Sequence, residues 1–349
     1  MFIWLIATFC LKEGWSGLVD EILGEHEIIR LIQQRLAVMP GMLIGFGDDV
    51  AAVPLGNGLM AVLKTDMLIG HTDVPKGMSL WQAAHKAVVM NVSDFASKGI
   101  QPSAALAAIG LPKNMATKKA ASDIADGLNA GAQEYGCYIV GGDTNEGSDL
   151  ILGISLFGVA KTERLILRSG AKVGDILAVT GPFGKTAAGL RLLLGDYSAS
   201  QQVREVLVDS VLNPKARLRE GLALAGCGQA VSSSMDSSDG LAWSLHELAR
   251  QSDVGFVVDN LPVAPEVKKF ASANKLDAAD LALYGGEEYE LVLTIAPKLW
   301  AEAKTAVEAV SGCLIPIGRA THEMGVTLDF EGKKQAIEAR GFEHFTAQE

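Results

Sequence analysis

The sequence predicts an α/β protein of two domains, and three observations lead to this expectation. The chain has 349 residues, which is enough for two domains of ordinary size. Short apolar runs typical of strands alternate with amphipathic patterns typical of helices. The 38 glycines mark many short connections, as in α/β enzymes. Since 49% of the residues are hydrophobic and only 6% aromatic, the core is expected to consist mainly of Ala, Val, Leu and Ile.

Charge and cysteine content exclude several classes of protein. The net charge of −11 argues against broad nucleic-acid binding, which needs a basic surface. No run of Lys or Arg indicates an anionic membrane as partner. The four cysteines are far apart and form no C-x-x-C pair, so we expect buried thiols in a reducing cytoplasm.

The N-terminus begins with an apolar run at residues 2–11 that is too short to span a bilayer. It has no basic n-region and no clear cleavage site. Three interpretations stay open: a poorly ordered extension, a helix docked on the surface, or sequence upstream of the true start. Residues 1–23 are therefore treated as an N-terminal extension.

The first domain is expected at residues 24–160. Ser79 is the predicted N-cap of a long helix, and Gly136 ends another. The predicted helices are 25–36, 79–98 and 113–136, and the predicted strands are 59–64, 102–111, 137–140 and 150–159.

The composition changes near residue 161, where a polar, glycine-marked stretch begins, so the second domain is expected at residues 161–349. Pro214 and Pro265 are expected in the first turns of two of its helices. The predicted helices are 184–194, 213–224, 241–251, 265–273 and 298–310. The predicted strands are 175–180, 231–236, 255–258, 289–295 and 313–318.

Aspartates recur at glycine- or serine-marked breaks beside apolar segments. A single aspartate of this kind usually caps a helix or forms a turn. Several of them follow predicted strands, and ligands in α/β proteins gather where strands end. Carboxylates together with phosphate oxygens suit Mg²⁺, and no His-Cys cluster indicates zinc. The seven aspartates are Asp48, Asp49, Asp66, Asp94, Asp143, Asp236 and Asp239.

Carboxylates of this number point to Mg²⁺ with a polyphosphate, and phosphoryl transfer is then the natural reaction class. Lys64, Arg168 and Lys185 are candidate phosphate-binding cations, although each could equally be a solvated surface charge. The segment 181–186 resembles the end of a Walker A loop but has two residues between its glycines where that motif has four. It is either a generic anion site at a helix N-terminus or only a cap. His246 lies near Ser232–Ser234 and Asp236, but no G-x-S-x-G elbow is present, so packing is its favoured role.

A series of motifs resembles a known family over residues 24 to 346. They are Asp48-Asp49, Lys64-Thr65-Asp66, Asn91-Val-Ser-Asp94, Gly141-Gly-Asp-Thr144, Arg168-Ser-Gly-Ala-Lys-Val-Gly-Asp175, Asp236-Ser-Ser-Asp239-Gly240-Leu241 and Gly285-Gly-Glu-Glu-Tyr-Glu290. In this order they resemble the thiamine-monophosphate kinase family of the aminoimidazole-ribonucleotide-synthetase-like (PurM-like) superfamily.

The resemblance implies that ATP phosphorylates thiamine phosphate at a cleft between the domains. It also implies an N-terminal sheet domain that forms a homodimer and a C-terminal α/β domain. The implied ligands of several Mg²⁺ ions are Asp49, Thr65, Asp66, Asp94, Asp143, Asp236 and Asp239. The implied ATP contacts are Gly142, Asp143, Arg168 and Ser238. The implied substrate contacts are His71, Glu287 and Phe342.

Four positions depart from the family pattern. Lys64 stands where many relatives have serine, and an ammonium group supplies charge but cannot ligate a metal. Glu288 replaces an aspartate, Lys185 replaces another, and His71 lies in a shorter loop than expected. Two alternatives stay open: another ATP-dependent enzyme of the superfamily, such as aminoimidazole-ribonucleotide synthetase, or a non-catalytic metal-binding relative.

Overall fold

The computed structural model describes residues 23–330 and 332–345. Of these residues, 23–38 and 343–345 belong to one unit, and those from Met39 to Phe342 belong to a second. The first unit contains helix α2 (Glu25–Gln33), predicted at 25–36. Within that unit, the backbone amide of His344 donates a hydrogen bond to Glu25. The predicted extension at residues 1–23 lies outside the described residues except for its last residue.

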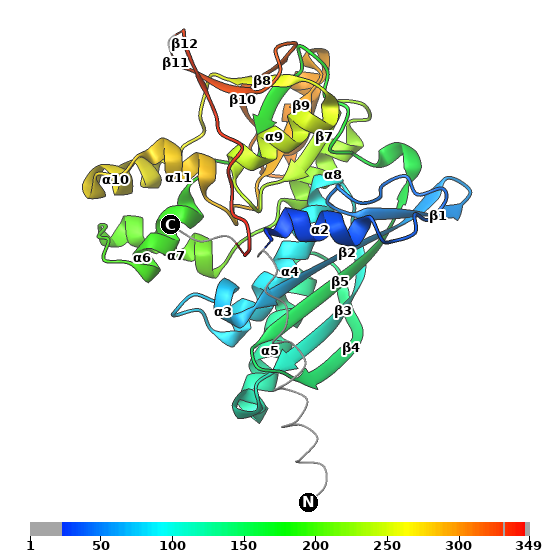
Figure 1. Cartoon of the computed structure of the whole chain (residues 1–349), viewed down its shortest axis with the longest axis vertical. Coiled ribbons are helices and arrows are strands. Elements are labelled where there is room, and N and C mark those ends of the chain that lie inside the picture. The colour runs from blue at the N-terminus through cyan, green and yellow to red at the C-terminus, as the bar shows by residue number, and fades with distance from the viewer. Residues whose placement is uncertain (1–22, 331, 346–349) are drawn as a thin grey trace, which may run out of the picture. The chain divides into compact units, whose positions relative to one another are not determined.

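The second unit contains two sheets with their helices, which confirms the mixed α/β expectation (Figure 1). We name the five-stranded sheet sheet A and the seven-stranded sheet sheet B. Their strand orders are β1-β2-β5-β3-β4 and β12-β11-β8-β10-β6-β9-β7. Apart from the parallel pairs β3/β4 and β8/β11, neighbouring strands in the described residues are antiparallel.

Sheet A is formed by the first half of the unit. Its strands are β1 (Ala51–Gly56), β2 (Leu59–Ile69), β3 (Pro102–Leu111), β4 (Tyr138–Glu146) and β5 (Ile151–Lys161). Its helices are α3 (Gly70–Asp73), α4 (Leu80–Ser97) and α5 (Lys118–Glu134), with short 3-10 turns at Lys113–Met115 and Thr162–Arg164. Thr117 caps α5, so this helix begins later than the predicted residue 113.

Two strands of sheet A continue past the points where we expected them to end. The strand predicted at 59–64 runs to Ile69, because β5 pairs with every residue of β2. The strand predicted at 137–140 runs to Glu146 along β3. In both strands, cross-strand pairing overrides the local breaks that the sequence indicated. Asp66 and Asp143 therefore lie within strands, not at strand ends.

Sheet B is formed by the second half. Its strands are β6 (Ile176–Val179), β7 (Val231–Asp236), β8 (Gly255–Val258), β9 (Leu291–Ile295), β10 (Ile315–Thr321), β11 (Val326–Phe330) and β12 (Lys333–Ala336). Its helices are α6 (Lys185–Leu194), α7 (Gln201–Leu212), α8 (Leu218–Gly226), α9 (Leu241–Ser252), α10 (Pro265–Asn274), α11 (Ala278–Tyr284) and α12 (Trp300–Ala309), with a 3-10 turn at Pro297–Leu299.

Helix 213–224 was wrongly predicted to open at Pro214, because α7 ends just before this proline and α8 begins after it at Leu218. Proline restricts the preceding residue to extended conformations and so separates the two helices. Strands β1, β11 and β12 and helices α7 and α11 were not predicted, since they are short or lack a clear apolar period.

Helix α4 connects the two halves and carries much of the site. Its N-cap is Ser79, as predicted, and the structure adds a capping box between Ser79 and Gln82. Nearly its whole circumference is buried, because it packs on α5 and sheet A and also on α8 and β7 (Figure 1). Glycine permits the close approach of α8, since a Cβ at Gly221 would lie 2.0 Å from the Ala96 carbonyl oxygen.

Candidate functional site

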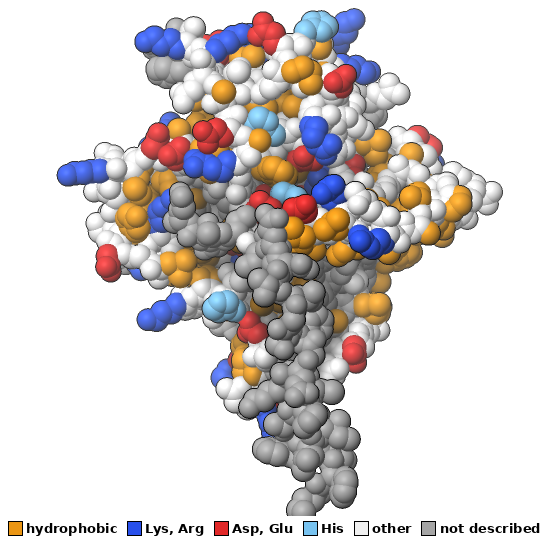
Figure 2. All heavy atoms as spheres, viewed as in Figure 1, with side chains coloured by type: hydrophobic (Ala, Val, Ile, Leu, Met, Phe, Trp, Pro, Cys, Tyr) orange, Lys and Arg blue, Asp and Glu red, His pale blue; other side chains and the backbone are white. Residues whose placement is uncertain are grey.

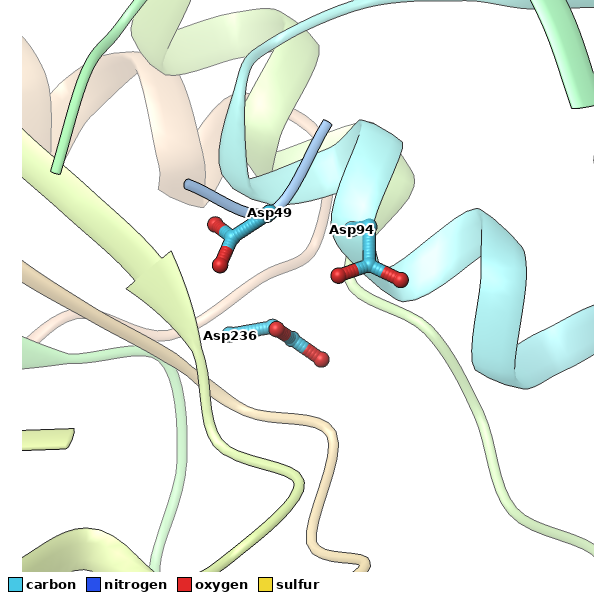
Figure 3. Close-up of side chains that lie close together, drawn as sticks. All are labelled: Asp49, Asp94 and Asp236. Atoms are coloured by element: carbon cyan, nitrogen blue, oxygen red, sulfur yellow. The ribbon is translucent and has the colours of Figure 1, made fainter. Parts of the chain in front are cut away.

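Three buried carboxylates converge where the two sheets meet around α4. Asp49 comes from the loop before β1, Asp94 from the last turns of α4, and Asp236 from the end of β7. Figure 3 shows the three side chains close together, each coming from a different segment of the chain. One carboxylate oxygen from each lies within 4.8 Å of the other two. Residues separated by up to 187 positions are thus brought together.

Asp49 is compensated by charged partners on both oxygens. Arg168 donates from Nε to Oδ1 at 2.6 Å and also contacts Oδ1 through Nη2. The Lys98 ammonium lies 2.8 Å from Oδ2, which also accepts from Ser97 Oγ. Although burial opposes the shift, Arg168 and Lys98 hold the pKa of Asp49 well below its usual range. Asp49 is therefore ionised.

Its neighbour Asp48 organises the same loop. Asp48 Oδ1 accepts a hydrogen bond from the Asp49 amide at 2.7 Å, and Oδ2 accepts from the Arg168 amide at 3.1 Å. Lys98 Nζ lies 2.6 Å from Asp48 and also donates to the Ser234 carbonyl. Lys98 is fully buried, so its ammonium group pairs with these partners and not with solvent.

Asp94 and Asp236 have fewer compensating partners. Ser93 Oγ donates to Asp236 at 2.7 Å, and Lys64 Nζ lies 3.1 Å from Asp94. Burial, together with Asp49, raises the pKa of Asp236 to about 7. Burial raises the pKa of Asp94 well above its usual range, and although Lys64 opposes the shift, Asp236 adds to it. Both carboxylates favour an added positive charge.

We define the carboxylate cluster as Asp48, Asp49, Asp66, Asp94 and Asp236 with the cations Lys64, Lys98 and Arg168. When all five carboxylates are ionised, the three cations leave two negative charges uncompensated among these described residues. Arg168 also approaches Glu247, but that carboxylate is paired with Arg250 at 2.8 Å. A doubly charged, oxygen-seeking ion such as Mg²⁺ matches both the charge and the donor set.

Asp66 reaches the cluster along one face of sheet A, whereas Thr65 points to the other. Lys64 and Asp66 lie on the same face of β2 as the buried Val62 and Leu68, because residues two apart on a strand share a face. This is the face covered by α4. The Thr65 hydroxyl bonds on the exposed face, donating to the Ile154 carbonyl and accepting from Ser155. The Thr65 side chain is therefore not among the cluster's oxygens, contrary to the pattern we expected.

Asp143 also lies apart from the cluster. It is exposed on the edge strand β4 and aligns with Ala108, Gly153 and Met67 across the sheet. That row is on the exposed face, opposite to Asp66, and three strand spacings of about 4.8 Å separate Asp143 from β2. The expectation that all seven aspartates gather together is wrong for Asp143 within one chain. Its neighbour Gly142 faces β3 so closely that a Cβ would lie 1.8 Å from the Ala107 carbonyl oxygen.

Two loops of the second half meet beside Asp236. The Glu287 amide donates to the Ser238 carbonyl at 2.6 Å, and the Phe342 amide donates to the Asp239 carbonyl at 2.9 Å. Glu287 has a φ of +60°, a conformation that non-glycine residues rarely adopt. These hydrogen bonds join one loop assembly, which contains Ser238, Asp239, Glu287 and Phe342. The order of the motifs along the chain could not show that these residues meet. Asp239 is not in the three-carboxylate group.

Lys86 is an important residue that we did not predict. It lies on α4, is almost completely buried, and its ammonium is 2.5 Å from Glu287 and 3.0 Å from the Asp73 carbonyl oxygen. Asp73 ends the short helix α3, which also carries the exposed His71. Lys86 thus links the segments of two implied substrate contacts. A lysine inside the apolar run of α4 was the only sequence signal.

The Walker-like segment proves to be capped by the protein's own carboxylate. Gly184 has a φ of +95°, and its amide and that of Thr186 donate to Glu288 at 2.8 and 3.0 Å. Nearby, Arg217 holds Glu290 with two hydrogen bonds of 2.8 and 2.5 Å. Of the two interpretations left open, the cap is therefore the one that the geometry supports.

His246 bonds the Ile337 carbonyl at 2.8 Å, which agrees with a packing role.

No helix in residues 23–330 and 332–345 is long and apolar enough to cross a membrane.

Comparisons with known proteins agree with this arrangement. Residues 47–160 match the family described as AIR synthase related protein, N-terminal domain, and residues 172–331 match the corresponding C-terminal domain. A thiamine-monophosphate kinase from Nitrosopumilus maritimus is 36% identical over 93% of this chain and 99% of the relative. One from Pyrococcus horikoshii is 38% identical over 92% of this chain and 96% of the relative.

A solved structure described as AaThiL complexed with AMPPCP and TMP has a similar fold. It superposes with a TM-score of 0.81 at 28% identity, covering 94% of this chain and all of that one. Similarity of this extent in sequence and structure spans more than nine-tenths of the chain. The chain therefore belongs to the thiamine-monophosphate kinase family.

Proposed function

We propose that this protein transfers the γ-phosphoryl group of ATP to thiamine monophosphate, giving thiamine diphosphate and ADP. The observation that carries the proposal is the carboxylate cluster, whose two uncompensated negative charges lie where the two halves meet. Relatives over 90% of the chain are thiamine-monophosphate kinases, and the AaThiL structure was solved with AMPPCP and TMP.

Mg²⁺ is part of this proposal. Asp49, Asp94 and Asp236 would hold it, since their oxygens are close together, buried and favoured in the ionised form by a cation. Asp239 is proposed as a further ligand from the cluster's border, and so is Asp66 through Oδ2, since Lys64 holds its Oδ1. Bound Mg²⁺ would neutralise charge on phosphate oxygens. The positions of these carboxylates would fix the position of the ion.

The remaining assignments are proposals supported by position. We assign ATP contacts to Ser238 and Arg168, which lie beside Asp236 and Asp49, and to Gly142 and Asp143. Contact by the latter two requires ATP to reach the exposed face of sheet A, or requires a second chain. For thiamine phosphate we assign His71, Glu287 and Phe342, because Lys86 and the loop assembly bring their segments together. Thr65 is proposed as a metal ligand on the same condition as Gly142 and Asp143, because its hydroxyl lies on that exposed face.

A direct assay tests the function. The full chain is incubated with Mg-ATP and thiamine monophosphate, and thiamine diphosphate and ADP are quantified by chromatography. Equal amounts of both products are expected, with none after chelation of the metal. ATP consumption only with formylglycinamidine ribonucleotide would favour the aminoimidazole-ribonucleotide synthetase alternative and contradict the proposal.

We also propose a homodimer formed through sheet A. Apolar side chains gather on the sheet face opposite α4, including Leu106, Tyr138 and Val140, the last two 63% and 65% exposed. In Figure 2, hydrophobic side chains are also exposed at the β1–β2 end of the sheet. Such a face favours association with a second apolar surface.

Val140→Lys should convert the dimer to a monomer in sedimentation experiments, whereas an unchanged mass would contradict this interface.

Two further assignments complete the proposal. The domain boundary is placed at residue 160, since β5 ends at Lys161 and the next strand begins at Ile176. The reaction is placed in the cytoplasm, a reducing compartment that suits the free thiols of Cys137, Cys227 and Cys313.

A further inference from the structure

Lys64 lies between two carboxylates that come from different elements. Its Nζ is 3.1 Å from Asp66 Oδ1 and 3.1 Å from Asp94 Oδ2. Lys64 and Asp66 are two residues apart on β2, so both side chains project from the same face of the sheet. Asp94 approaches from α4 above that face. The ammonium group thus bridges strand and helix, as a bound cation does.

The lysine divides the cluster into two parts. Asp49, Asp94 and Asp236 form the group whose oxygens lie within 4.8 Å, and Asp66 is not a member. Asp66 instead faces the ammonium group, which shares Asp94 with the three-carboxylate group. Mg²⁺ binds oxygens at about 2.0–2.1 Å, so it cannot occupy the space between Asp66 and Asp94 while the ammonium is there.

The charge balance of the cluster also indicates that Lys64 takes the place of a cation. With Lys64 present, the cluster carries two excess negative charges, which one divalent ion neutralises. Without it, the excess rises to three, and two of the carboxylates lose their nearest cation. Buried carboxylates without a partner are strongly destabilised, so they attract any available cation.

We propose that the Lys64 ammonium replaces a divalent cation between Asp66 and Asp94, so that the nucleotide-loaded protein binds one metal ion fewer than it would with a neutral residue at position 64. The proposal rests on the proposed function only in taking the cluster as the metal-nucleotide site. Lys64 is a positioning residue here: it holds Asp66 and Asp94 in place and acts on the substrate through them.

Counting bound metal tests the proposal without measuring activity. Mn²⁺ bound per chain is determined by equilibrium dialysis with saturating AMPPCP for the wild type, Lys64→Ser and Lys64→Gln. We expect both variants to bind one more Mn²⁺ than the wild type. Lys64→Gln is one atom shorter than lysine and keeps a neutral N–H donor group, so it supplies the result if Lys64→Ser does not fold.

Two matched variants control for charge and position. Lys64→Arg keeps the bridging cation and should bind the wild-type number of ions. Lys161→Ser removes an exposed lysine from β5 of the same sheet and should also leave the number unchanged. If both neutral variants at position 64 bind the wild-type number, or if Lys161→Ser gains an ion as well, the proposal is overturned.

Thermal melting gives a second readout. In metal-free buffer, Lys64→Gln should melt below the wild type because Asp66 and Asp94 lose their shared cation. Saturating Mg²⁺ should raise its Tm by more than it raises that of the wild type. An equal Mg²⁺-induced shift in the two proteins would contradict the proposal. Neither experiment depends on whether thiamine monophosphate is phosphorylated, so failure of the assay for function would be seen separately.

Discussion

The protein contains two groups of acidic side chains in its interior, and the groups differ in how their negative charges are balanced. In the carboxylate cluster, five carboxylates share three cations, and the pKa values of Asp94 and Asp236 are raised. At the start of α6, Glu288 accepts two backbone amide hydrogen bonds, and Glu290 is held by Arg217 and Thr180. Glu290 accepts two hydrogen bonds from the guanidinium of Arg217, whereas Asp94 shares Lys64 with Asp66, and among the described residues Asp236 accepts a hydrogen bond only from the neutral Ser93 hydroxyl.

The difference separates a site from a structural contact. Burial alone does not distinguish the two groups, because both lie in the interior. What differs is the balance of charge and donors, which is complete at Glu290 and incomplete at Asp94 and Asp236. An incomplete balance of charge at a buried site is where a metal and a phosphate add the most free energy.

The largest effect is expected for Asp236→Asn. The change removes a carboxylate from the three-carboxylate group, so kcat/KM for thiamine monophosphate should fall by at least about 10²-fold. The Tm of the metal-free protein should stay the same or rise, since Asn relieves the repulsion from Asp49. Steady-state kinetics and circular dichroism measure the two quantities.

Asp126→Asn, at an exposed position on α5, is the control for Asp236→Asn and should keep wild-type kinetics. Wild-type activity in Asp236→Asn would place this carboxylate with the structural group. A large loss of Tm in the metal-free variant would do the same.

Arg217→Met should affect stability and not metal binding. It leaves the Glu290 carboxylate buried without its bidentate partner, which should lower the free energy of unfolding by about 3 kcal/mol. Urea denaturation measures this loss, and Mn²⁺ binding with AMPPCP should remain at the wild-type number. The double variant Arg217→Met/Glu290→Gln should recover part of the stability. If metal binding is lost while the fold remains, the two groups are not separate.

The smallest effect is a pH dependence at Glu288. Burial raises the pKa of Glu288 from 4.5 to about 8, although Lys185 and the α6 amides oppose the shift. The folded state then holds a proton that the unfolded state has lost, so this group's contribution to stability falls as pH rises from about 4.5 to about 8. Glu288→Gln keeps the acceptor oxygen but cannot ionise.

The Glu288→Gln variant should therefore equal the wild type near pH 4, below both pKa values, and exceed it in Tm near pH 8.5. The difference should grow through the window between the two pKa values. Melting curves at a series of pH values measure it. A constant difference at all pH values would show that Glu288 keeps an ordinary pKa in the fold.

Local sequence determined the elements with strong signals. Ser79 and Gln82 specify the start of α4, and the alternating or continuous apolar runs specify β3, β7 and β8 at their observed positions. These signals act between residues a few positions apart, so they need no knowledge of the fold. The residue types also indicated Mg²⁺ chemistry, because hard oxygen donors do not depend on topology.

Tertiary structure decided which of these residues meet. Pairing with β5 extends β2 through Asp66 and, by strict alternation, turns Thr65 and Asp66 to opposite faces. The same ladder places Asp143 on the exposed face, far from Asp94. The lysines Lys64, Lys86 and Lys98 gain their partners only because α4 is buried between the two halves. A buried charge must find its counter-ion across the fold, and the spacing of residues along a chain cannot show which one it finds.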